Sequence, residues 1–356
     1  MNETPTAERE ILLDVRGPRA DTGAPVSGQK SVLRIAFERP WVRALAPLCF
    51  VLIIGAVFNA QGSFFKWGTH RDMLRQVSVY GILACGMTLV IITGGIDLAV
   101  GSILGVCAVI FSILSIHLGW SAWAAIPLVV LAGTTCGLLS GGMVARFRMQ
   151  PFIATLAVMV FARGLAKWVS GGQKISSAVL NPDGSYKYVD LPRIFSALDH
   201  KILGENIAVV TLIFLACIGL CRVLLAKLRW GRYFYATGGN EEAARLSGIP
   251  TQGVKLLAYG MSGLLSAVAG ICQAVQEQQG DPEAGSTYEL SAIAIVVMGG
   301  TSLNGGRGGM LFTLVGAMTI GYLEKILSIN AVGEASRLML TGSIIVAAVL
   351  FQRVRK

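Results

Sequence analysis

Long apolar runs alternate with shorter polar stretches along most of this chain. Runs of about 20 residues recur, and such a run is long enough for one helix to cross the hydrocarbon core of a bilayer. The pattern therefore predicts an all-α integral membrane fold with about ten transmembrane helices. We place these helices at residues 43–60, 74–93, 98–117, 122–144, 152–170, 205–226, 254–276, 288–300, 309–328 and 336–352.

The basic residues predict how these helices are oriented. An even number of crossings puts both termini on one side of the membrane. Lysine and arginine gather near residues 146–148, between residues 222 and 255, and at the C-terminus. Cytoplasmic loops carry an excess of these residues, so we expect cytoplasmic N- and C-termini. The loop at residues 61–73 contains Lys66 and Arg71 and departs from this bias.

Two polar segments stand out from the apolar pattern. Residues 1–40 are charged and rich in proline and glycine, which indicates a disordered cytoplasmic N-terminal tail before a polytopic domain at residues 41–356. Residues 171–204 form a long polar segment on the predicted outer side. Long segments of this kind are commonly functional. We expect this one to face a soluble partner; the alternative is a lid without a partner.

A short polar stretch on the predicted cytoplasmic side reads GGNEEAARLSGIP, residues 238–250. Asn240 suits an N-cap, and the two glutamates that follow it suit the positive first turn of a helix. Gly248 and Pro250 end that helix. A helix this short cannot span a bilayer and is not stable by itself. It suits a peg that docks into a partner; the alternative is an amphipathic loop on the membrane surface.

Two glycine-rich motifs occupy corresponding places in the two halves of the chain. The first is GGIDLAVGS at residues 94–102, and the second is GGTSLNGGR at residues 299–307. Each follows an apolar run rich in β-branched residues and precedes another predicted span. The match indicates two related halves in parallel orientation, with helices broken at the glycines. Such breaks free backbone groups that protein or water must satisfy, and they commonly line a transport route.

Asp97 is the ionisable residue of the first motif. A charge near membrane depth is costly and marks a functional candidate. The alternative is that Asp97 caps the helix after it, and the pattern slightly favours the cap over a contact with a transported molecule. The residues that we assign to a translocation pathway are Gly94, Gly95, Asp97, Gly101, Ser102, Gly299, Gly300, Thr301 and Asn304.

Composition and motifs exclude several other classes of protein. The chain is 54% hydrophobic and 14% charged, against about 25% charged residues in a soluble domain. Its net charge of +10 fits basic loops better than a nucleic-acid partner. The seven cysteines form no CxxC pair and the three histidines are scattered, so we expect no metal and no cofactor. No lysine follows a glycine, so the chain lacks a phosphate-binding Walker A loop, and we expect no enzyme.

Few charges fall inside the predicted spans. Arg163 and Lys167 lie one helical turn apart near an outer end, and we expect both to extend toward the lipid headgroups. Glu324 and Lys325 lie near the end of another span and are expected at the interface. An ion relay needs several acids in helix interiors. The pattern therefore disfavours an ion-coupled transporter.

Four linked motifs carry a resemblance to a known family. They are GMTLVIITGGIDLAVGS (86–102), PFIATLAVMVFARGLA (151–166), GGNEEAARLSGI (238–249) and AIVVMGGTSLNGGRGG (294–309). In this order and spacing, the chain resembles the permease subunits of bacterial ABC sugar importers of the ribose/xylose/galactose type. The resemblance covers about residues 75–350 and leaves the N-terminal tail outside it.

The resemblance implies a permease of the bacterial inner membrane that forms the pathway for a monosaccharide, a ribose-type pentose or a hexose. It implies a separate cytoplasmic ATPase subunit with two fused cassettes, an extracytoplasmic sugar-binding protein, and a second permease that is a copy or a paralogue. It places a coupling helix for the ATPase at about residues 239–249. The coupling residues are Asn240, Glu241, Glu242, Ala243, Ala244, Leu246 and Gly248.

Two other classes stay open. An ion-gradient-coupled secondary transporter of a small polar solute needs no ATPase and responds to a proton or sodium gradient. A membrane scaffold or channel shows no substrate-stimulated ATPase activity in its complex. The residues do not identify the sugar, and they do not decide between an identical and a related second permease.

Overall fold

A computed structural model describes residues 40–180, 185–202, 204–333, 335–340, 342–343 and 346 of this chain. Its helices are α2 (Pro40–Val57), α3 (Trp67–Ile92), α4 (Val100–Ser112), α5 (Ala122–Arg146), α6 (Pro151–Ser170), α7 (Arg193–Asp199), α8 (Val209–Lys227), α9 (Arg229–Gly239), α10 (Glu241–Leu246), α11 (Thr251–Glu277), α12 (Tyr288–Met298) and α13 (Met310–Ile329). A 3-10 turn, Ser63–Phe65, precedes α3, and a π-helical turn, Ile113–His117, extends α4.

Two small antiparallel hairpins complete the described structure. Strand β1 (Ala178–Leu180) pairs with β2 (Tyr186–Tyr188), and β3 (Lys201–Ile202) pairs with β4 (Ile207–Ala208). Both hairpins belong to the long polar segment between α6 and α8. The rest of the regular structure in the described part of the chain is helical, as the apolar pattern predicts.

Seven of the described helical segments are long and apolar enough to cross a membrane: α3, α4 with its π-helical turn, α5, α6, α8, α11 and α13. Two further apolar helices, Ala44–Val57 within α2 and the whole of α12, are shorter. The all-α membrane fold is confirmed, whereas the count of about ten stays a prediction. The span expected at 336–352 falls mostly, and the tail expected at 1–40 almost wholly, outside the described residues.

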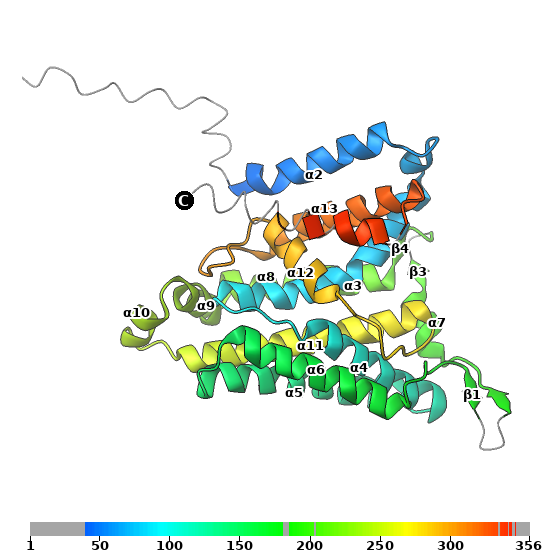
Figure 1. The fold of residues 1–356 in the computed structure, drawn as a ribbon, viewed down its shortest axis with the longest axis horizontal. Coiled ribbons are helices and arrows are strands. Elements are labelled where there is room, and N and C mark those ends of the chain that lie inside the picture. The colour runs from blue at the N-terminus through cyan, green and yellow to red at the C-terminus, as the bar shows by residue number, and fades with distance from the viewer. Residues whose placement is uncertain are drawn as a thin grey trace, which may run out of the picture.

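Helix α11 packs against α3, α4 and α5, and in the view of Figure 1 it lies between α3 and α5. Glycines allow its closest approach, because a Cβ atom on Gly263 of α11 would lie 2.3 Å from the carbonyl oxygen of Gly133 on α5. Small residues commonly let membrane helices approach in this way. Helices α3 and α4 are consequently enclosed by protein, with 83% of each apolar stretch buried.

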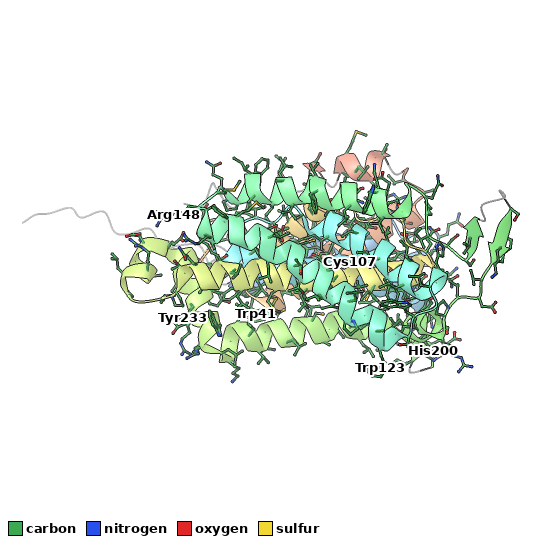
Figure 2. The ribbon with its side chains drawn as sticks, turned by 90° about the horizontal axis from the view of Figure 1, so that it is seen from below. Trp41, Cys107, Trp123, Arg148, His200 and Tyr233 are labelled. Atoms are coloured by element: carbon green, nitrogen blue, oxygen red, sulfur yellow. The ribbon has the colours of Figure 1, made fainter. Side chains whose placement is uncertain are left out.

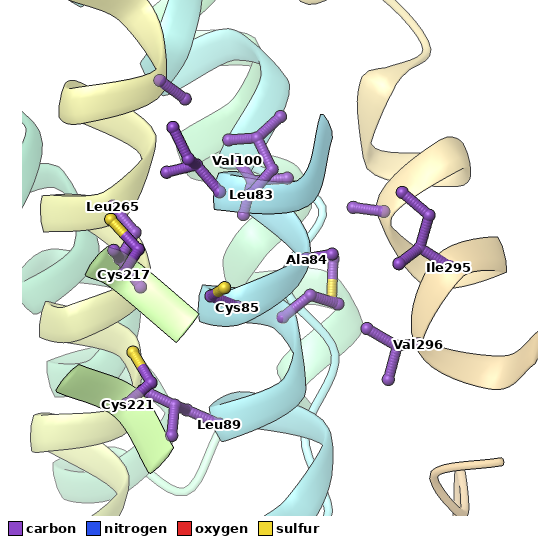
Figure 3. Close-up of a cluster of buried hydrophobic side chains, with 14 of the residues drawn as sticks. Leu83, Ala84, Cys85, Leu89, Val100, Cys217, Cys221, Leu265, Ile295 and Val296 are labelled. Atoms are coloured by element: carbon purple, nitrogen blue, oxygen red, sulfur yellow. The ribbon is translucent and has the colours of Figure 1, made fainter. Parts of the chain in front are cut away.

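The interior of the bundle is apolar. Figure 3 shows Cys85 of α3 beside Cys217 and Cys221 of α8, among leucine and valine side chains. All three thiols are free and buried. They therefore act as small hydrophobic side chains, as expected from their positions in apolar runs.

The long polar segment at residues 171–204 and the short polar stretch at residues 238–250 lie at opposite ends of the bundle. Figure 1 shows α9 and α10 at one end, and α7 with the strands of the two hairpins at the other. In Figure 2, Arg148 and Tyr233 lie toward the first end, and Trp123 and His200 lie toward the second. We call the first the α10 end and the second the hairpin end.

Candidate functional site: the α10 end of the bundle

Helix α10 forms because its first turn is capped by side chains of its own sequence. The Oδ1 atom of Asn240 accepts a hydrogen bond from the backbone N–H of Ala243 at 3.0 Å, so Asn240 is the N-cap. Glu241 and Glu242 occupy the first turn, where carboxylates favour the positive helix end. Gly248 ends the helix with a φ of +81°, a conformation that glycine adopts without strain.

Two ion pairs hold α10 in place. Arg245 pairs with Glu242 at 2.6 Å within the helix, and Lys255 of α11 pairs with Glu241 at 2.6 Å. The hydrogen bond from Arg245 lowers the pKa of Glu242 below its ordinary value. Glu241 therefore joins α10 to α11, whereas Glu242 pairs within α10 and its side chain is 66% exposed.

The apolar positions of α10 face in different directions. Ala244 is only 5% exposed and packs inside the chain, whereas Leu246 is 77% exposed. Ala243 is exposed as well. Of the three apolar residues predicted to contact a partner, Ala244 is thus turned away from any partner in this arrangement. Leu246 is the large apolar side chain that α10 presents.

A cleft of about 780 Å³ lies between α10 and the turn that joins α5 to α6. Its lining includes Arg148, Met149, Arg245, Ile249 and Lys255. Arg148 adopts a φ of +53°, and Phe147 beside it is exposed. The basic α5–α6 turn and α10 therefore form the two walls of one surface feature.

The first glycine motif lies directly behind α10. A second cavity, of about 210 Å³, is lined by Gly94 and Gly95 from that motif and by Gly239, Asn240 and Glu241 from the start of α10. Thr93, Lys255 and Tyr259 also line it. Helix α10 packs against α9 and α11, and the end of α9 at Gly238 meets the carbonyl of Ile92 at the end of α3.

The second glycine motif meets the first one at the same place. The backbone N–H of Gly306 donates a hydrogen bond to the carbonyl of Ile92 at 2.9 Å. A Cβ atom on Gly238 would lie 1.8 Å from that carbonyl oxygen, and one on Gly305 would lie 3.0 Å from the Cα atom of Gly94. We call this meeting of residues 92–95, 238–239 and 305–306 the glycine junction. Sequence reasoning missed its close approach at Gly238, although the Gly-Gly pair before Asn240 was visible.

Asp97 is fully buried and faces α11 rather than an open space. Its Oδ1 atom accepts a hydrogen bond from the backbone N–H of Ala99 at 3.0 Å, and its Oδ2 atom accepts one from the Ser262 hydroxyl at 2.7 Å. These bonds order the entry into α4 and join it to α11. Asp97 therefore orders the turn before α4, whose N-cap is Ala99 without a side-chain cap hydrogen bond, and a contact with a transported molecule stays a prediction.

The remaining residues assigned to a pathway are spread over several places. Gly101 packs against the loop between α11 and α12, since a Cβ there would lie 2.1 Å from the Gly285 carbonyl oxygen. Gly300 has a φ of +90° at the end of α12. Ser102, Gly299 and Thr301 are buried, and Asn304 is exposed in the turn of the second motif.

The expectation of extension toward the lipid headgroups is wrong for Arg163, which is bound by protein, and stays a prediction for Lys167, whose side chain is 51% exposed. The Arg163 guanidinium donates hydrogen bonds to the backbone carbonyls of Pro282 and Ala284, and Lys167 pairs with Glu283 at 2.6 Å. Because these partners lie more than a hundred residues away in the chain, local sequence gave no sign of them. Both cations hold the loop between α11 and α12.

Among the described residues, no group of three or more His, Cys, Asp or Glu side chains is arranged to bind a metal ion.

The sequence of this chain is similar to those of several known proteins. Residues 71–349 match the family model described as branched-chain amino acid transport system / permease component. The chain is 35% identical over 316 residues to the ribose import permease protein RbsC of Escherichia coli (strain K12), covering 88% of this chain and 95% of that protein. It is 31% identical to the L-arabinose transport system permease protein AraH of the same strain over 335 residues, 94% of this chain and 96% of that protein. It is 32% identical to the fructose import permease protein FruG of Bifidobacterium longum over 323 residues, 88% of this chain and 90% of that protein. No solved structure matches the chain.

Proposed function

Because the chain belongs to the family of branched-chain amino acid transport system permease components, we propose that it is the permease subunit of an ATP-binding-cassette importer for a monosaccharide. A separate cytoplasmic ATPase powers the importer. The substrate is a ribose-type pentose or a hexose, since the similar proteins are named for ribose, L-arabinose and fructose. A multi-pass location in the bacterial inner membrane follows from the apolar helices and from the same relatives.

The observation that carries the coupling role is the construction of α10. The helix is capped by Asn240, tied to α11 through Glu241, and presents Leu246 to the outside at 77% exposure. A short helix held rigidly, with one exposed apolar side chain, fits the groove of a partner. The first glycine motif lies immediately behind it. ATP-driven motion of the partner would therefore reach the helix break that we assign to the pathway.

In this proposal the other partners also bind at separate parts of the permease. The extracytoplasmic sugar-binding protein docks at the hairpin end, and the ATPase, with two cassettes in one chain, docks at the α10 end. A second permease, identical or related, completes the pathway within the lipid bilayer. In this proposal the permease has no catalytic residue at either end, because the ATPase subunit hydrolyses ATP.

The first experiment measures how the ATPase associates with α10. Wild type and Leu246→Asp are compared by pull-down of the ATPase, and Tyr188→Asp is the matched control, since Tyr188 is also 78% exposed but lies in the hairpin β1–β2. We expect Leu246→Asp alone to lose association. Ala244→Asp would instead place a charge inside the chain and disturb α10 itself. Normal association of the Leu246 variant would contradict the coupling role.

The second experiment separates the importer from a secondary transporter. The permease, its ATPase and the sugar-binding protein are placed in proteoliposomes, and uptake of ribose, L-arabinose and fructose is measured with and without ATP. Ionophores that collapse proton and sodium gradients should leave uptake unchanged. Uptake that needs a gradient and proceeds without ATP would overturn the proposal.

A further inference from the structure

A polar and aromatic cluster lies near the hairpin end of the bundle, away from α10. It consists of five side chains from four helices: Tyr80 of α3, Gln273 and Glu277 of α11, Tyr288 of α12 and Glu324 of α13. Gln273 and Glu277 belong to the last turns of α11, the end of that helix farthest from α10. We call these residues the Tyr80–Tyr288 cluster. None of them belongs to either glycine motif.

The side chains of this cluster contact one another. The rings of Tyr80 and Tyr288 pack with their centroids 4.4 Å apart at an angle of 46°. The Gln273 amide donates a hydrogen bond to Glu277 at 2.5 Å and lies 3.4 Å from the Tyr288 hydroxyl. Glu324 lies on α13, which packs against both α3 and α12. Polar and aromatic groups of α3, α11 and α12 therefore meet at one place, with α13 packed beside them.

Such a cluster is costly for a membrane protein. Carboxylates and amides in membrane-spanning helices lose hydration, and they are retained mainly where they serve transport or binding. Leucine or phenylalanine at these positions would pack the helices together without that cost. The cluster is also not sealed off, since Glu277 is exposed and Tyr80, Tyr288 and Glu324 are partly exposed, whereas Gln273 is buried. Its polar groups are thus accessible once the hairpin end opens.

The chemistry of the cluster matches a sugar. Aromatic rings offer an apolar face to the C–H groups of a sugar ring, and carboxylates and amides accept and donate hydrogen bonds with its hydroxyls. We propose that the Tyr80–Tyr288 cluster is a sugar-contact site in the outer half of the pathway, an inference that rests on the proposed function. The sugar passes between the two rings, and its hydroxyls replace the contacts that Gln273, Glu277 and Tyr288 make with one another. Contacts of this kind must be weak enough to release the sugar inward.

Contacts beside the cluster join it to the hairpin end. The Gln276 amide, on the same turn of α11 as Gln273 and Glu277, donates a hydrogen bond to the backbone carbonyl of Arg75 at 2.9 Å. Arg75 pairs in turn with Asp199 of α7. In this arrangement α7 is fixed to α3 between the cluster and the hairpins. Sugar delivered at the hairpin end would therefore reach the cluster when the contact between Arg75 and Asp199 is released.

The test uses the complete importer in proteoliposomes and measures uptake of ribose and fructose separately. The variants are Tyr288→Leu, Gln273→Leu and Glu324→Gln. The matched control is Tyr322→Leu, because Tyr322 lies on α13 close to Glu324 but contacts His70 and Phe64 instead. The readout is the ratio of the two uptake rates, together with association of the ATPase and the amount of protein in the membrane.

We expect all three cluster variants to assemble normally and to show a changed ratio of ribose to fructose uptake. In Tyr288→Leu at least, we expect uptake to fall about tenfold, which corresponds to about 1.4 kcal/mol. Tyr322→Leu should keep the wild-type ratio. A role in packing alone would slow both sugars equally, so an unchanged ratio in all three assembled variants overturns the site. If wild type itself carries no sugar with ATP, the proposed function fails instead, and the two failures are distinguishable.

Discussion

Single glycine residues set how closely three segments approach at the glycine junction. At Gly238, the carbonyl oxygen of Ile92 occupies the space that a Cβ atom would need. The neighbouring Gly239 has no atom within 4 Å of its own Cβ position. Adjacent glycines therefore differ completely in what they tolerate. The sequence shows the pair, but only the fold shows which member is required.

We predict that Gly238→Ala destabilises the protein and Gly239→Ala does not. Overpacking at a site without free space costs on the order of 1–3 kcal/mol, and here the obstructing group is backbone that cannot rotate away. Alanine at position 239 is expected to be neutral or slightly stabilising, because it favours the end of α9. Thermal unfolding of the two variants in detergent checks this. Equal melting temperatures would contradict the role of Gly238.

Asp97 gives a second prediction at the level of one residue. Replacing it by alanine removes the acceptor for the Ala99 N–H and the Ser262 hydroxyl, and leaving buried donors unpaired costs about 1–3 kcal/mol each. Asp97→Asn keeps a carbonyl acceptor and should retain most of the stability and most of the sugar uptake. Thermal unfolding and uptake are measured for both variants. A stable Asp97→Asn protein that no longer carries sugar would instead support a direct contact with the substrate.

Among the elements, the loop between α11 and α12 lies outside the predicted spans, whereas the short helix after it lies within the span predicted at residues 288–300. Helix α12 has only 11 residues, which at 1.5 Å per residue gives about 16 Å, roughly half of a hydrocarbon core. The loop before it packs along α4, with Gly285 against Gly101 and Gly280 against Ser112. It therefore follows α4 over several turns instead of lying above the bundle. Arg163 and Lys167 of α6 hold it there.

The two cations on α6 should contribute unequally to holding this loop. Arg163 satisfies the carbonyls of Pro282 and Ala284, both buried residues, so Arg163→Ala leaves these acceptors unpaired. Lys167 and Glu283 form an exposed pair, with side chains 51% and 59% exposed, and such pairs contribute about 0–1 kcal/mol. Hydrogen exchange of residues 278–287 is the measurement. We expect faster exchange in Arg163→Ala and little change in Lys167→Ala; the reverse order would show that the ion pair holds the loop.

Some elements and contacts of this protein could be predicted from its sequence and others could not, for a physical reason. Helix α10 was predictable because its capping residues and first-turn charges are close to Asn240 in the sequence. The role of Arg163 was not predictable, because its partners Pro282 and Ala284 lie in the loop after α11. The same residue spacing also suits an arginine that reaches the headgroups. For the same reason Tyr80, Gln273 and Tyr288 did not stand out, and Glu324 was expected at the interface. Each is unremarkable in its own helix, and only packing brings them together.

At the scale of the whole molecule, the two ends of the bundle differ in charge and construction. The α10 end holds Arg146, Arg148, Lys227, Arg229 and Arg245 at helix ends and turns. Both ends contain ion pairs, and at the hairpin end Asp199, Asp281 and Glu283 bind Arg75, Lys174 and Lys167. Clustered lysine and arginine residues favour the cytoplasmic side. The α10 end is therefore expected to face the cytoplasm.

This orientation gives a prediction that labelling can check. Tyr188→Cys and Leu246→Cys each place a thiol at an exposed position, one at each end of the bundle. Both variants are made in a protein in which the exposed Cys49 is replaced by serine. The other six native thiols are buried, and their labelling gives the background level. A membrane-impermeant maleimide should label Tyr188→Cys in spheroplasts and Leu246→Cys only in inside-out vesicles. Burial of the native thiols keeps the background low, because the thiol must be exposed to react. Labelling of Leu246→Cys in intact spheroplasts would show the opposite orientation. Helix α10 would then lie outside the cell and could not contact a cytoplasmic ATPase.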